Sequence, residues 1–247
     1  MTVQIRLAET AYEIETALRI RHDVLIIEDG KYGGTGLQGR CLVDRFDALP
    51  TVFHMLAYDG TEPVGTMRLV RDSEVGMPVD DLYDFRAYRA QVSSGRYARF
   101  GSAGMLAIRR PWRRRRDVLA AMFSLAAAVC HDEGTTHVLV VVNHENVGMY
   151  RRLGLTPLRD KFWDAAIGNA IVPLAGLTED FLRWAQPRGA LRVVSSSPFV
   201  LPRPRGGLRS VGVDPDGLPL HIRPYGQVYA QHQLLRAAEW SSAGCGQ

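Results

Sequence analysis

The order of hydrophobic and polar positions in the N-terminal part of the chain predicts strands around one long helix. Thr10 followed by Glu13 matches a capping box, so we expect the helix to begin there and to run to about Ile27. A turn at Asp59-Gly60 separates two of the strand patterns, which favours a hairpin. The strands are predicted by alternating or apolar runs at residues 3–7, 51–58 and 63–70.

Strand and helix patterns then alternate through the middle of the chain. A strand pattern over 102–108 is followed by an arginine-rich turn and by an alanine-rich helix pattern over 116–131. Residues 136–142 form a continuous apolar run, which is typical of a strand that is buried on both faces. Asn143 opens another short helix pattern, which ends near Gly154. This alternation predicts an α/β fold.

The remaining segments contain more loop-forming residues. Residues 30–39 hold five glycines and are expected to form a mobile loop, whereas residues 80–91 have a pattern compatible with a helix. Residues 186–218 are rich in Pro, Gly, Arg and Ser, and a helical pattern returns at 226–239.

Composition indicates an ordinary globular protein, since 46% of the 247 residues are hydrophobic and 23% are charged. No apolar stretch is long enough for a membrane span and the N-terminus does not resemble a secretory signal, so we expect a cytoplasmic protein. The three cysteines form neither a disulfide framework nor a metal-binding spacing, which suits a reducing compartment. The formal net charge is only +4, yet six arginines lie within residues 109–116, and this cluster requires a local explanation.

One arginine interrupts the apolar face of the first predicted helix. At helical spacing, Arg21 lies on the same face as Ile14, Leu18 and Leu25. A charged group on such a face is costly to bury unless a carboxylate meets it. We therefore predict a buried ionic cluster of Arg21, Asp44, Asp47 and Arg68. The cluster would either anchor the N-terminal helix or bind the carboxylate of an acceptor substrate through an arginine.

The segment that begins at Asn143 carries the first family resemblance. It reads NHENVGMYRRLGL, in which Asn143 precedes Tyr150 by seven residues and Gly154 follows between leucines. This segment resembles the closing signature of the GNAT N-acyltransferase superfamily, and the strand, arginine turn and helix before it stand where that superfamily keeps its cofactor-binding strand and pyrophosphate loop. The resemblance implies a GNAT-like α/β (α+β) fold with a mixed, mostly antiparallel sheet flanked by helices. It also implies acyl transfer from a phosphopantetheine thioester to an amine.

The N-terminal half resembles a narrower branch of the same superfamily. The segments RHDVL at 21–25, DRFD at 44–47 and VGTMRL at 64–69 are similar in order and spacing to acyl-homoserine-lactone synthases and to the related N-acyl amino acid synthases. Those enzymes use long-chain acyl thioesters, commonly on acyl carrier protein. The lactone synthases keep a Glu and an Arg where this chain has Ser102 and Met105. S-adenosylmethionine is therefore not expected as the acceptor, nor a lactone as the product.

The resemblance assigns donor binding to Leu106, Ala107, Ile108, Arg113, Arg114, Arg115, Arg116, Asp117 and Val118. A backbone N–H from Leu106 to Ile108 would polarise the thioester carbonyl. Arg116 and Val118 replace the glycines of the usual pyrophosphate loop, and their side chains would crowd an approach to the backbone amides. Either arginine side chains hold the donor phosphates, or the acidic surface of a carrier protein docks against the turn. A solvated basic turn without a partner is the simpler alternative.

Candidate catalytic residues follow from the same resemblance. Tyr150 stands where the superfamily keeps the general acid that protonates the departing thiolate, and Asn143 and Glu28 complete the candidate set. The alternative for Tyr150 is a helix aromatic that only packs on the sheet. The general base stays open among Glu28, Asp44, His54, Glu145 and a water molecule. The histidines show no metal-ligand spacing, so no metal is expected.

Together these patterns predict a GNAT-like acyltransferase domain over residues 1–165 and a C-terminal extension of unknown role over 166–247. The predicted reaction moves a medium or long acyl chain from acyl carrier protein or coenzyme A to the amine of an amino acid or a similar small metabolite. The rival predictions are an acetyl-CoA-dependent N-acetyltransferase and a degenerate fold that binds an acyl carrier without turnover. A nucleic-acid-binding module is disfavoured, because only Trp112 lies as an aromatic among the arginines.

Overall fold

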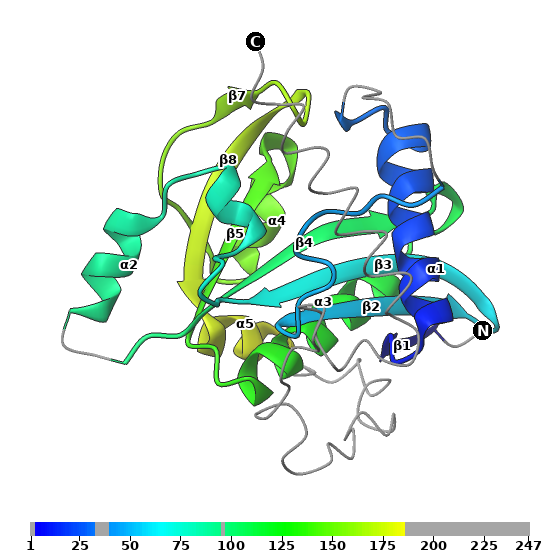
Figure 1. The fold of residues 1–247 in the computed structure, drawn as a ribbon, viewed down its shortest axis with the longest axis horizontal. Helices are drawn as coiled ribbons and strands as arrows, with labels where there is room; N and C mark the ends of the chain where they lie inside the picture. Colours follow the sequence, from blue (N-terminus) through cyan, green and yellow to red (C-terminus); the bar gives the residue numbers. More distant parts are fainter. Residues whose placement is uncertain (1–2, 33–39, 95–96, 186–247) are drawn as a thin grey trace, which may run out of the picture.

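The computed structural model describes residues 3–32, 40–94 and 97–185, which form a central sheet with helices on both faces (Figure 1). The strands are β1 (Val3–Leu7), β2 (Val52–Asp59), β3 (Glu62–Arg71), β4 (Phe100–Ile108), β5 (His137–Asn143), β6 (Thr156–Pro157), β7 (Phe162–Asp164) and β8 (Asn169–Leu177). The α-helices are α1 (Ala11–Arg21), α2 (Arg86–Ser93), α3 (Arg116–Asp132), α4 (Val147–Arg152) and α5 (Thr178–Ala185). A π-helix, η1 (His22–Glu28), follows α1, and the 3₁₀ helices are η3 (Pro78–Asp81), η4 (Arg110–Trp112) and η5 (His144–Asn146).

Within the described residues, the sheet has eight strands in the order β1-β2-β3-β4-β5-β8-β6, and β7 also pairs with β8. Every neighbouring pair is antiparallel except β4 and β5, which run parallel. This is the mixed, mostly antiparallel sheet flanked by helices that the sequence analysis predicted.

Local signals explain where the first helix begins and where its winding changes. The hydroxyl of Thr10 accepts from the backbone N–H of Glu13 at 3.2 Å, and the Glu13 carboxylate accepts from the N–H of Thr10 at 3.1 Å. The predicted capping box is therefore formed, and α1 begins at Ala11. The helix predicted as far as Ile27 continues to Glu28, but the part after Arg21 is wound as a π-helix. Such segments occur frequently at functional sites.

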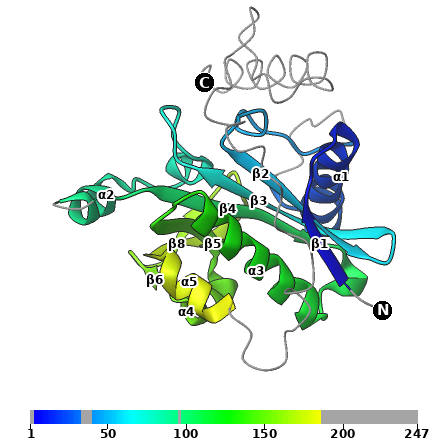
Figure 2. The ribbon, with the colours of Figure 1, turned by 90° about the horizontal axis from the view of Figure 1, so that it is seen from below.

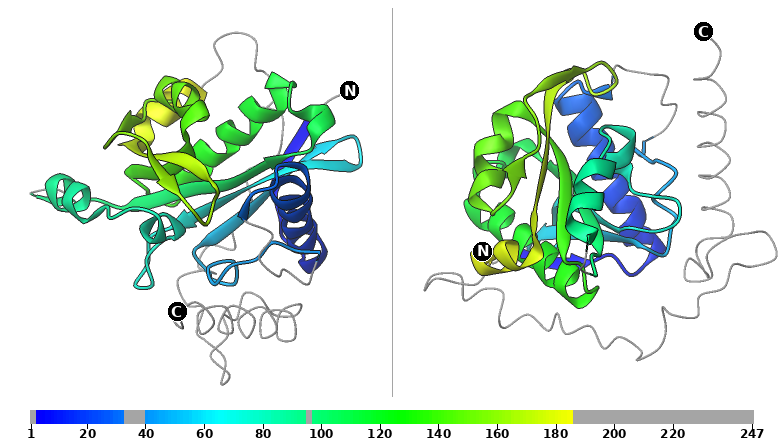
Figure 3. Two further views of the ribbon diagram at one scale, coloured as in Figure 1. Left: turned by 90° about the horizontal axis from the view of Figure 1, so that it is seen from above. Right: turned by 90° about the vertical axis from the view of Figure 1, so that its left-hand side faces the viewer.

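The helices divide between the two faces of the sheet (Figure 2). α1 covers one face, hereafter the α1 face, where Ile20 and Val24 pack with Leu56 of β2. On the opposite face, hereafter the α3 face, α3, α4 and α5 pack together over the sheet, with Phe123 and Tyr150 in its core. α2 projects from the body of the molecule, away from these helices (Figure 3).

The central pair of strands diverges. β4 and β5 pair only where Phe100–Ser102 meets His137–Leu139. Beyond that contact, β4 stays paired with β3 and β5 with β8, so the strands separate (Figure 1). The register between β3 and β4 also shifts in this diverging part, where Met105 has a φ of 52°. A bulge of this kind re-aims backbone groups and is common next to active sites.

The described fold extends past residue 165, where the sequence analysis ended the acyltransferase domain. β8 pairs with β5 from Asn143↔Ile171 to His137↔Leu177, and α5 packs on α3. The sheet and its helical layer therefore continue to Ala185. β8 was not predicted because Pro173 and Gly176 interrupt its strand pattern, and a proline usually argues against a central strand.

Residues 80–91 also differ from the single helix that was expected, since they hold the end of η3, a break and the start of α2. Phe85 in the break is buried, and its ring meets Tyr83 edge-on at 4.9 Å. Most of the predicted loop 30–39 and the predicted helix 226–239 lie outside the described residues. No helix in the described part of the chain combines the length and apolar character needed to cross a membrane.

Candidate active site

The four charged residues predicted to meet do form one ionic cluster, on the α1 face of the sheet. Asp47 lies at its centre, where Oδ1 accepts from Arg21 Nη1 at 2.7 Å and from Arg68 Nη1 at 2.8 Å. Arg68 Nη1 also donates to Asp44 Oδ1 at 2.6 Å. Burial alone would raise the pKa of Asp47, but Arg21 and Arg68 together hold it well below its ordinary value. The carboxylate therefore stays ionised inside the protein.

Exposure divides this cluster into a sealed half and an accessible half. The side chain of Arg21 is 0% exposed and that of Asp47 is 4% exposed, whereas that of Asp44 is 31% exposed. Arg68 uses only Nη1 on the two carboxylates, and its other N–H groups have no hydrogen-bond partner among the described residues. A ligand that enters beside the exposed Asp44 could therefore reach the unused N–H groups of Arg68, although Arg68 itself is only 2% exposed. Arg21 and Asp47 pair with each other, and the buried Nε of Arg21 has no partner among the described residues.

His54, from β2, completes the sealed half. Its Nδ1 lies 2.9 Å from Arg21 Nη2, and its Nε2 lies 3.3 Å from the backbone oxygen of Asp47. A guanidinium can only donate, so Nδ1 is the acceptor and Nε2 carries the proton. Burial and the charge of Arg21 lower the pKa of His54 to about 4. The imidazole is thus neutral at pH 7, and the lone pair that a general base would need is occupied by Arg21.

The arginine turn is tied to the end of η1. Arg113 Nη2 lies 2.7 Å from Glu28 Oε2, Arg113 Nη1 lies 2.8 Å from Asp29 Oδ1, and Arg113 Nε donates to the Ile108 carbonyl at 2.9 Å. The Glu28 carboxylate also accepts from the backbone N–H of Arg110 at 3.1 Å. Glu28, a candidate catalytic residue, is therefore engaged with this turn, and Arg113 has all three guanidinium nitrogens occupied within the protein.

The turn is held on its other side by the hairpin between β2 and β3. Asp59 Oδ2 accepts from Arg115 Nη1 at 2.8 Å and from Trp112 Nε1 at 3.0 Å. Arg115 also pairs with Asp117 at 2.7 Å. Two of the donor-binding candidates, Arg115 and Asp117, thus neutralise each other.

Arg114 and Arg116 differ from their neighbours, because both are exposed and neither has an ion-pair partner in the part of the chain that the structure describes. Arg109, by contrast, pairs with Asp23 at 3.1 Å. Val118 was expected to crowd the donor, but its side chain is fully buried in the core of the α3 face. Of the two residues that replace the glycines of the usual pyrophosphate loop, only Arg116 therefore places its side chain on the outer surface.

The last residues of β4 border the space where β4 and β5 separate. Leu106 and Ile108 pack on the core of the α3 face, whereas Ala107 packs on that of the α1 face. The N–H of Arg109 donates to the Val64 carbonyl of β3 at 2.9 Å. Because successive N–H groups of a strand point to opposite edges, the N–H of Ile108 points away from β3, toward the space between β4 and β5.

Tyr150, from α4, lies on the α3 face. Its ring is buried with Ile108 of β4 and Val142 of β5 in the same core, and it meets Phe123 edge-on at 5.8 Å between ring centroids. The hydroxyl makes no hydrogen bond to any described residue. Burial raises the pKa of Tyr150 to about 12. Tyr150 is thus both a packed aromatic and a protonated phenol whose hydroxyl is available to a ligand.

Asn143 is the last residue of β5 and pairs with Ile171, directly before the turn that leads to α4. Its side chain makes no hydrogen bond within the described ranges. Glu145, one of the general-base candidates, accepts from the Asn169 amide at 3.2 Å. Asn143 and Tyr150 therefore share one strand–helix junction, whereas Glu28 belongs to the arginine turn.

Tyr32, which the sequence analysis did not single out, contacts the bulge of β4 beside the ionic cluster. Tyr32, with a φ of 61°, and Met105 both have a left-handed backbone, and Tyr32 Oη donates to Met105 Sδ at 3.9 Å. Each such conformation costs about 1–3 kcal/mol in a non-glycine residue, and these conformations cluster at functional sites. Burial is the main cause that raises the pKa of Tyr32. The charge of Arg68 lowers this pKa and that of Asp44 raises it, which shows that the phenol lies close to the ionic cluster.

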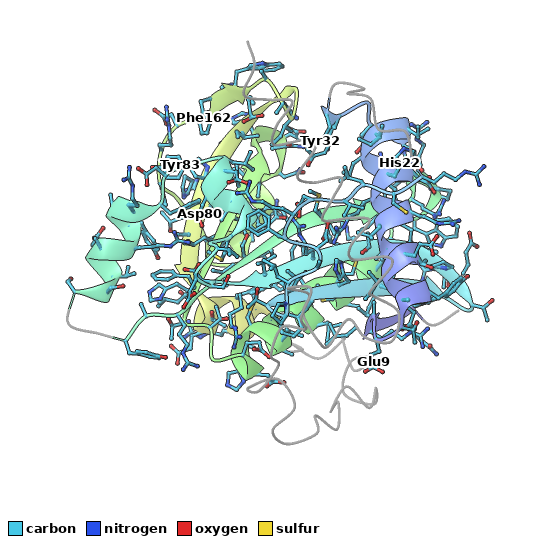
Figure 4. All side chains as sticks on the ribbon, viewed as in Figure 1. Glu9, His22, Tyr32, Asp80, Tyr83 and Phe162 are labelled. Atoms are coloured by element: carbon cyan, nitrogen blue, oxygen red, sulfur yellow. The ribbon has the colours of Figure 1, made fainter. Side chains whose placement is uncertain are left out.

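Figure 4 shows Tyr32 extending from the end of η1 toward the middle of the sheet. The glycines around Tyr32 indicated only a loop, so the sequence carried no signal for this contact.

Cys130 is buried, and burial raises the pKa of its thiol to about 12, so this thiol is protonated at neutral pH. Among residues 3–32, 40–94 and 97–185, no group of three or more His, Cys, Asp or Glu side chains could hold a metal ion.

Solved structures resemble this fold at low sequence identity. FeeM, an N-acyl amino acid synthase from uncultured soil microbes, matches with 15% identity and a TM-score of 0.59 over 72% of this chain and 92% of that chain. The CoA-dependent acyl-homoserine lactone synthase BjaI, with SAM and isopentyl-CoA, matches with 15% identity and a TM-score of 0.54 over 74% and 87%. An acyl-CoA N-acyltransferase from Pseudomonas aeruginosa matches with 14% identity and a TM-score of 0.50 over 71% and 99%.

Sequence comparison gives a more specific result. None of the curated protein sequences matches this chain. A protein-family model described as N-acyl amino acid synthase FeeM matches residues 16–176, which is more than half of the chain and includes the ionic cluster, the arginine turn and Tyr150. The chain therefore belongs to the FeeM family of N-acyl amino acid synthases.

Proposed function

We propose that this N-acyltransferase moves a medium or long acyl chain from a phosphopantetheine thioester to the amine of an amino acid or a similar small metabolite that carries a carboxylate. The observation that carries the proposal is the accessible half of the ionic cluster beside the bulge of β4. Arg68 offers N–H groups that no described residue uses, and Asp44 is 31% exposed beside it.

A free amino acid matches this pair of charges. Its carboxylate would accept charge-assisted hydrogen bonds from Arg68, and its amine would lie near Asp44. The sealed half, made of Arg21, Asp47 and His54, would hold Arg68 in place rather than touch the acceptor. The two roles considered for the cluster, anchoring and acceptor binding, would then belong to different members of it.

Acyl transfer would take place where β4 and β5 diverge. The acceptor nitrogen attacks the thioester carbonyl carbon, the new C–N bond forms and the C–S bond breaks. The N–H of Ile108 would stabilise the developing oxyanion, because it points toward this space. Tyr150 would give its phenol proton to the departing sulfur from the α3 face, and the proton lost by the amine would leave through water.

Tyr150→Phe tests the catalytic part of the proposal. Purified protein is incubated with dodecanoyl-loaded acyl carrier protein or dodecanoyl-CoA and a panel of amino acids, and released thiol and N-acyl product are measured. The wild type should form N-acyl amino acids, and Tyr150→Phe should lower kcat by about 10²–10⁴-fold with an unchanged circular dichroism spectrum. A wild type that uses only acetyl-CoA would support the acetyltransferase alternative, and one that binds donor without releasing thiol would support a non-catalytic carrier-binding protein.

The donor would be recognised by the unpaired arginines of the turn. Arg114 and Arg116 are exposed, whereas their neighbours are neutralised within the protein. An Arg114→Ser/Arg116→Ser double variant should raise KM for acyl carrier protein or acyl-CoA about tenfold or more at low salt. Acyl-pantetheine, which lacks the phosphates and the carrier, should react unchanged. Arg86→Ser, on the distant helix α2 and 88% exposed, is the matched control. Equal effects on all donors would contradict this assignment.

A further inference from the structure

Phe123 connects the candidate general acid to the last described helix. It lies on the buried side of α3 and is 2% exposed. Its ring meets Tyr150 of α4 at 5.8 Å, and Phe181 and Trp184 of α5 at 6.0 and 6.1 Å, each time edge-on. The three helices pack together on the same face of the sheet (Figure 2). Phe123 is therefore the shared member of an aromatic cluster that ends at Tyr150.

The direction of the Tyr150 hydroxyl depends on packing. The hydroxyl has no hydrogen-bond partner among the described residues, so no polar contact there holds the phenol in one orientation. The contact with Phe123, edge-on and 5.8 Å between ring centroids, is an arrangement that aromatic pairs prefer. It limits where the Tyr150 ring can lie, and the hydroxyl on the axis of that ring is placed with it. Phe181 and Trp184 of α5 contact other parts of the Phe123 ring, and no ring contact joins either of them to Tyr150 in the described structure.

We propose that Phe123 is a positioning residue for acyl transfer, which holds the ring of Tyr150 edge-on so that the hydroxyl meets the departing sulfur. This inference rests on the proposed role of Tyr150 as the general acid. A misplacement of about 1 Å in a reacting group can cost about 100-fold in rate. The loss should appear in kcat rather than in KM, because Phe123 lies in the core and touches neither substrate.

The experiment compares Phe123→Leu with Phe181→Leu. Both side chains are 2% exposed and touch each other, but only Phe123 meets Tyr150. For each folded variant, kcat and KM are measured with two donors that carry the same acyl chain, an alkyl thioester of pantetheine and an aryl thioester. The aryl thiolate is a weaker base and departs without needing a proton, so a defect in the general acid should disappear with this donor.

We expect Phe123→Leu to lower kcat by about 10- to 100-fold on the alkyl thioester, with little change on the aryl thioester, and Phe181→Leu to change neither. Equal losses on both donors, or the same pattern in Phe181→Leu, would show that Phe123 only fills the core. If Phe123→Leu fails to fold, Phe123→Met gives the same comparison, because its flexible side chain adapts to an irregular gap in the core.

Tyr150→Phe, measured on the same two donors, separates the two hypotheses. If Tyr150→Phe shows no dependence on the leaving group, the role of Tyr150 as the general acid is wrong, and the positioning role is overturned with it. If Tyr150→Phe shows that dependence and Phe123→Leu does not, only the role of Phe123 is overturned.

Discussion

Replacing Asp47 with Asn tests whether the ionic cluster stabilises the fold. The substitution keeps the shape of the side chain but removes the charge that faces Arg21 at 2.7 Å and Arg68 at 2.8 Å. Arg21 is 0% exposed, so water cannot replace the lost carboxylate at its Nη1. Breaking a buried pair from one side in this way costs about 3–5 kcal/mol.

This cost is a large part of the free energy of unfolding of a protein, which is roughly 5–15 kcal/mol. With a urea dependence of about 2 kcal/mol per M, the unfolding midpoint of Asp47→Asn should fall by about 2 M. Urea titration at pH 7, followed by tryptophan fluorescence, measures this shift. The pKa of Asp47 is lowered in the folded state, so its carboxylate contributes its full stability above the unfolded pKa, and pH 7 lies in that range.

Asp84→Asn is the matched control, because Asp84 also pairs with an arginine, Arg86, at 2.6 Å. The Asp84 side chain is 56% exposed, and an exposed pair of this kind contributes little to stability because water screens it. The two variants should therefore differ clearly in midpoint. If the free energy of unfolding of Asp47→Asn lies within about 1 kcal/mol of the wild-type value, the cluster does not stabilise the fold.

Two further predictions concern pH and backbone packing. Burial and Arg21 lower the pKa of His54 from 6.5 to about 4, so the unfolded chain binds a proton in this window that the folded chain does not. The free energy of unfolding of the wild type should therefore fall by about 3 kcal/mol as the pH falls through this window. His54→Gln should flatten that part of a plot of Tm against pH. If the slope of this plot is the same in the variant and the wild type, His54 is already charged in the folded protein. A Cβ added at Gly176 would lie 2.7 Å from the Gly154 oxygen, so Gly176→Ala should lower stability by about 1–3 kcal/mol in thermal unfolding. Gly148→Ala, where nothing lies within 4 Å, should be neutral or stabilising, and equal behaviour of the two variants would contradict this account.

The parts of the site that could be predicted are those that depend on short-range rules or on the cost of burying a charge. The capping box at Thr10 needs only a partner three residues away, so the sequence displays it directly. Arg21 on an apolar stripe required a buried carboxylate, and the acidic segment that holds Asp44 and Asp47 supplied it. The exposure of Asp44, which separates the accessible half of the cluster from the sealed half, depends on the packing and had no signal in the sequence.

The pairing within the arginine turn could not be predicted, because its partners are distant in the chain. Glu28 lies 85 residues before Arg113, and Asp59 lies 56 residues before Arg115. A run of arginines gives no indication of which members meet such partners. The distinction between paired and unpaired arginines, including the exposed Arg114, therefore required the three-dimensional structure.

The short parallel contact between β4 and β5 has a mechanical consequence. It divides the sheet into two units, β1 to β4 and β5 to β8, and joins them along one narrow hinge line. Longer antiparallel pairing holds β1 to β4 together in the first unit and β5 to β8 as a pair of strands in the second. At this hinge line, a Cβ added to Gly101 would lie 3.0 Å from Thr135 Cγ2. A larger residue there would change the angle between the two units and hence the width of the opening at Ile108. We therefore expect donor preference to change with substitutions at this hinge line, even though none of its residues needs to touch a substrate.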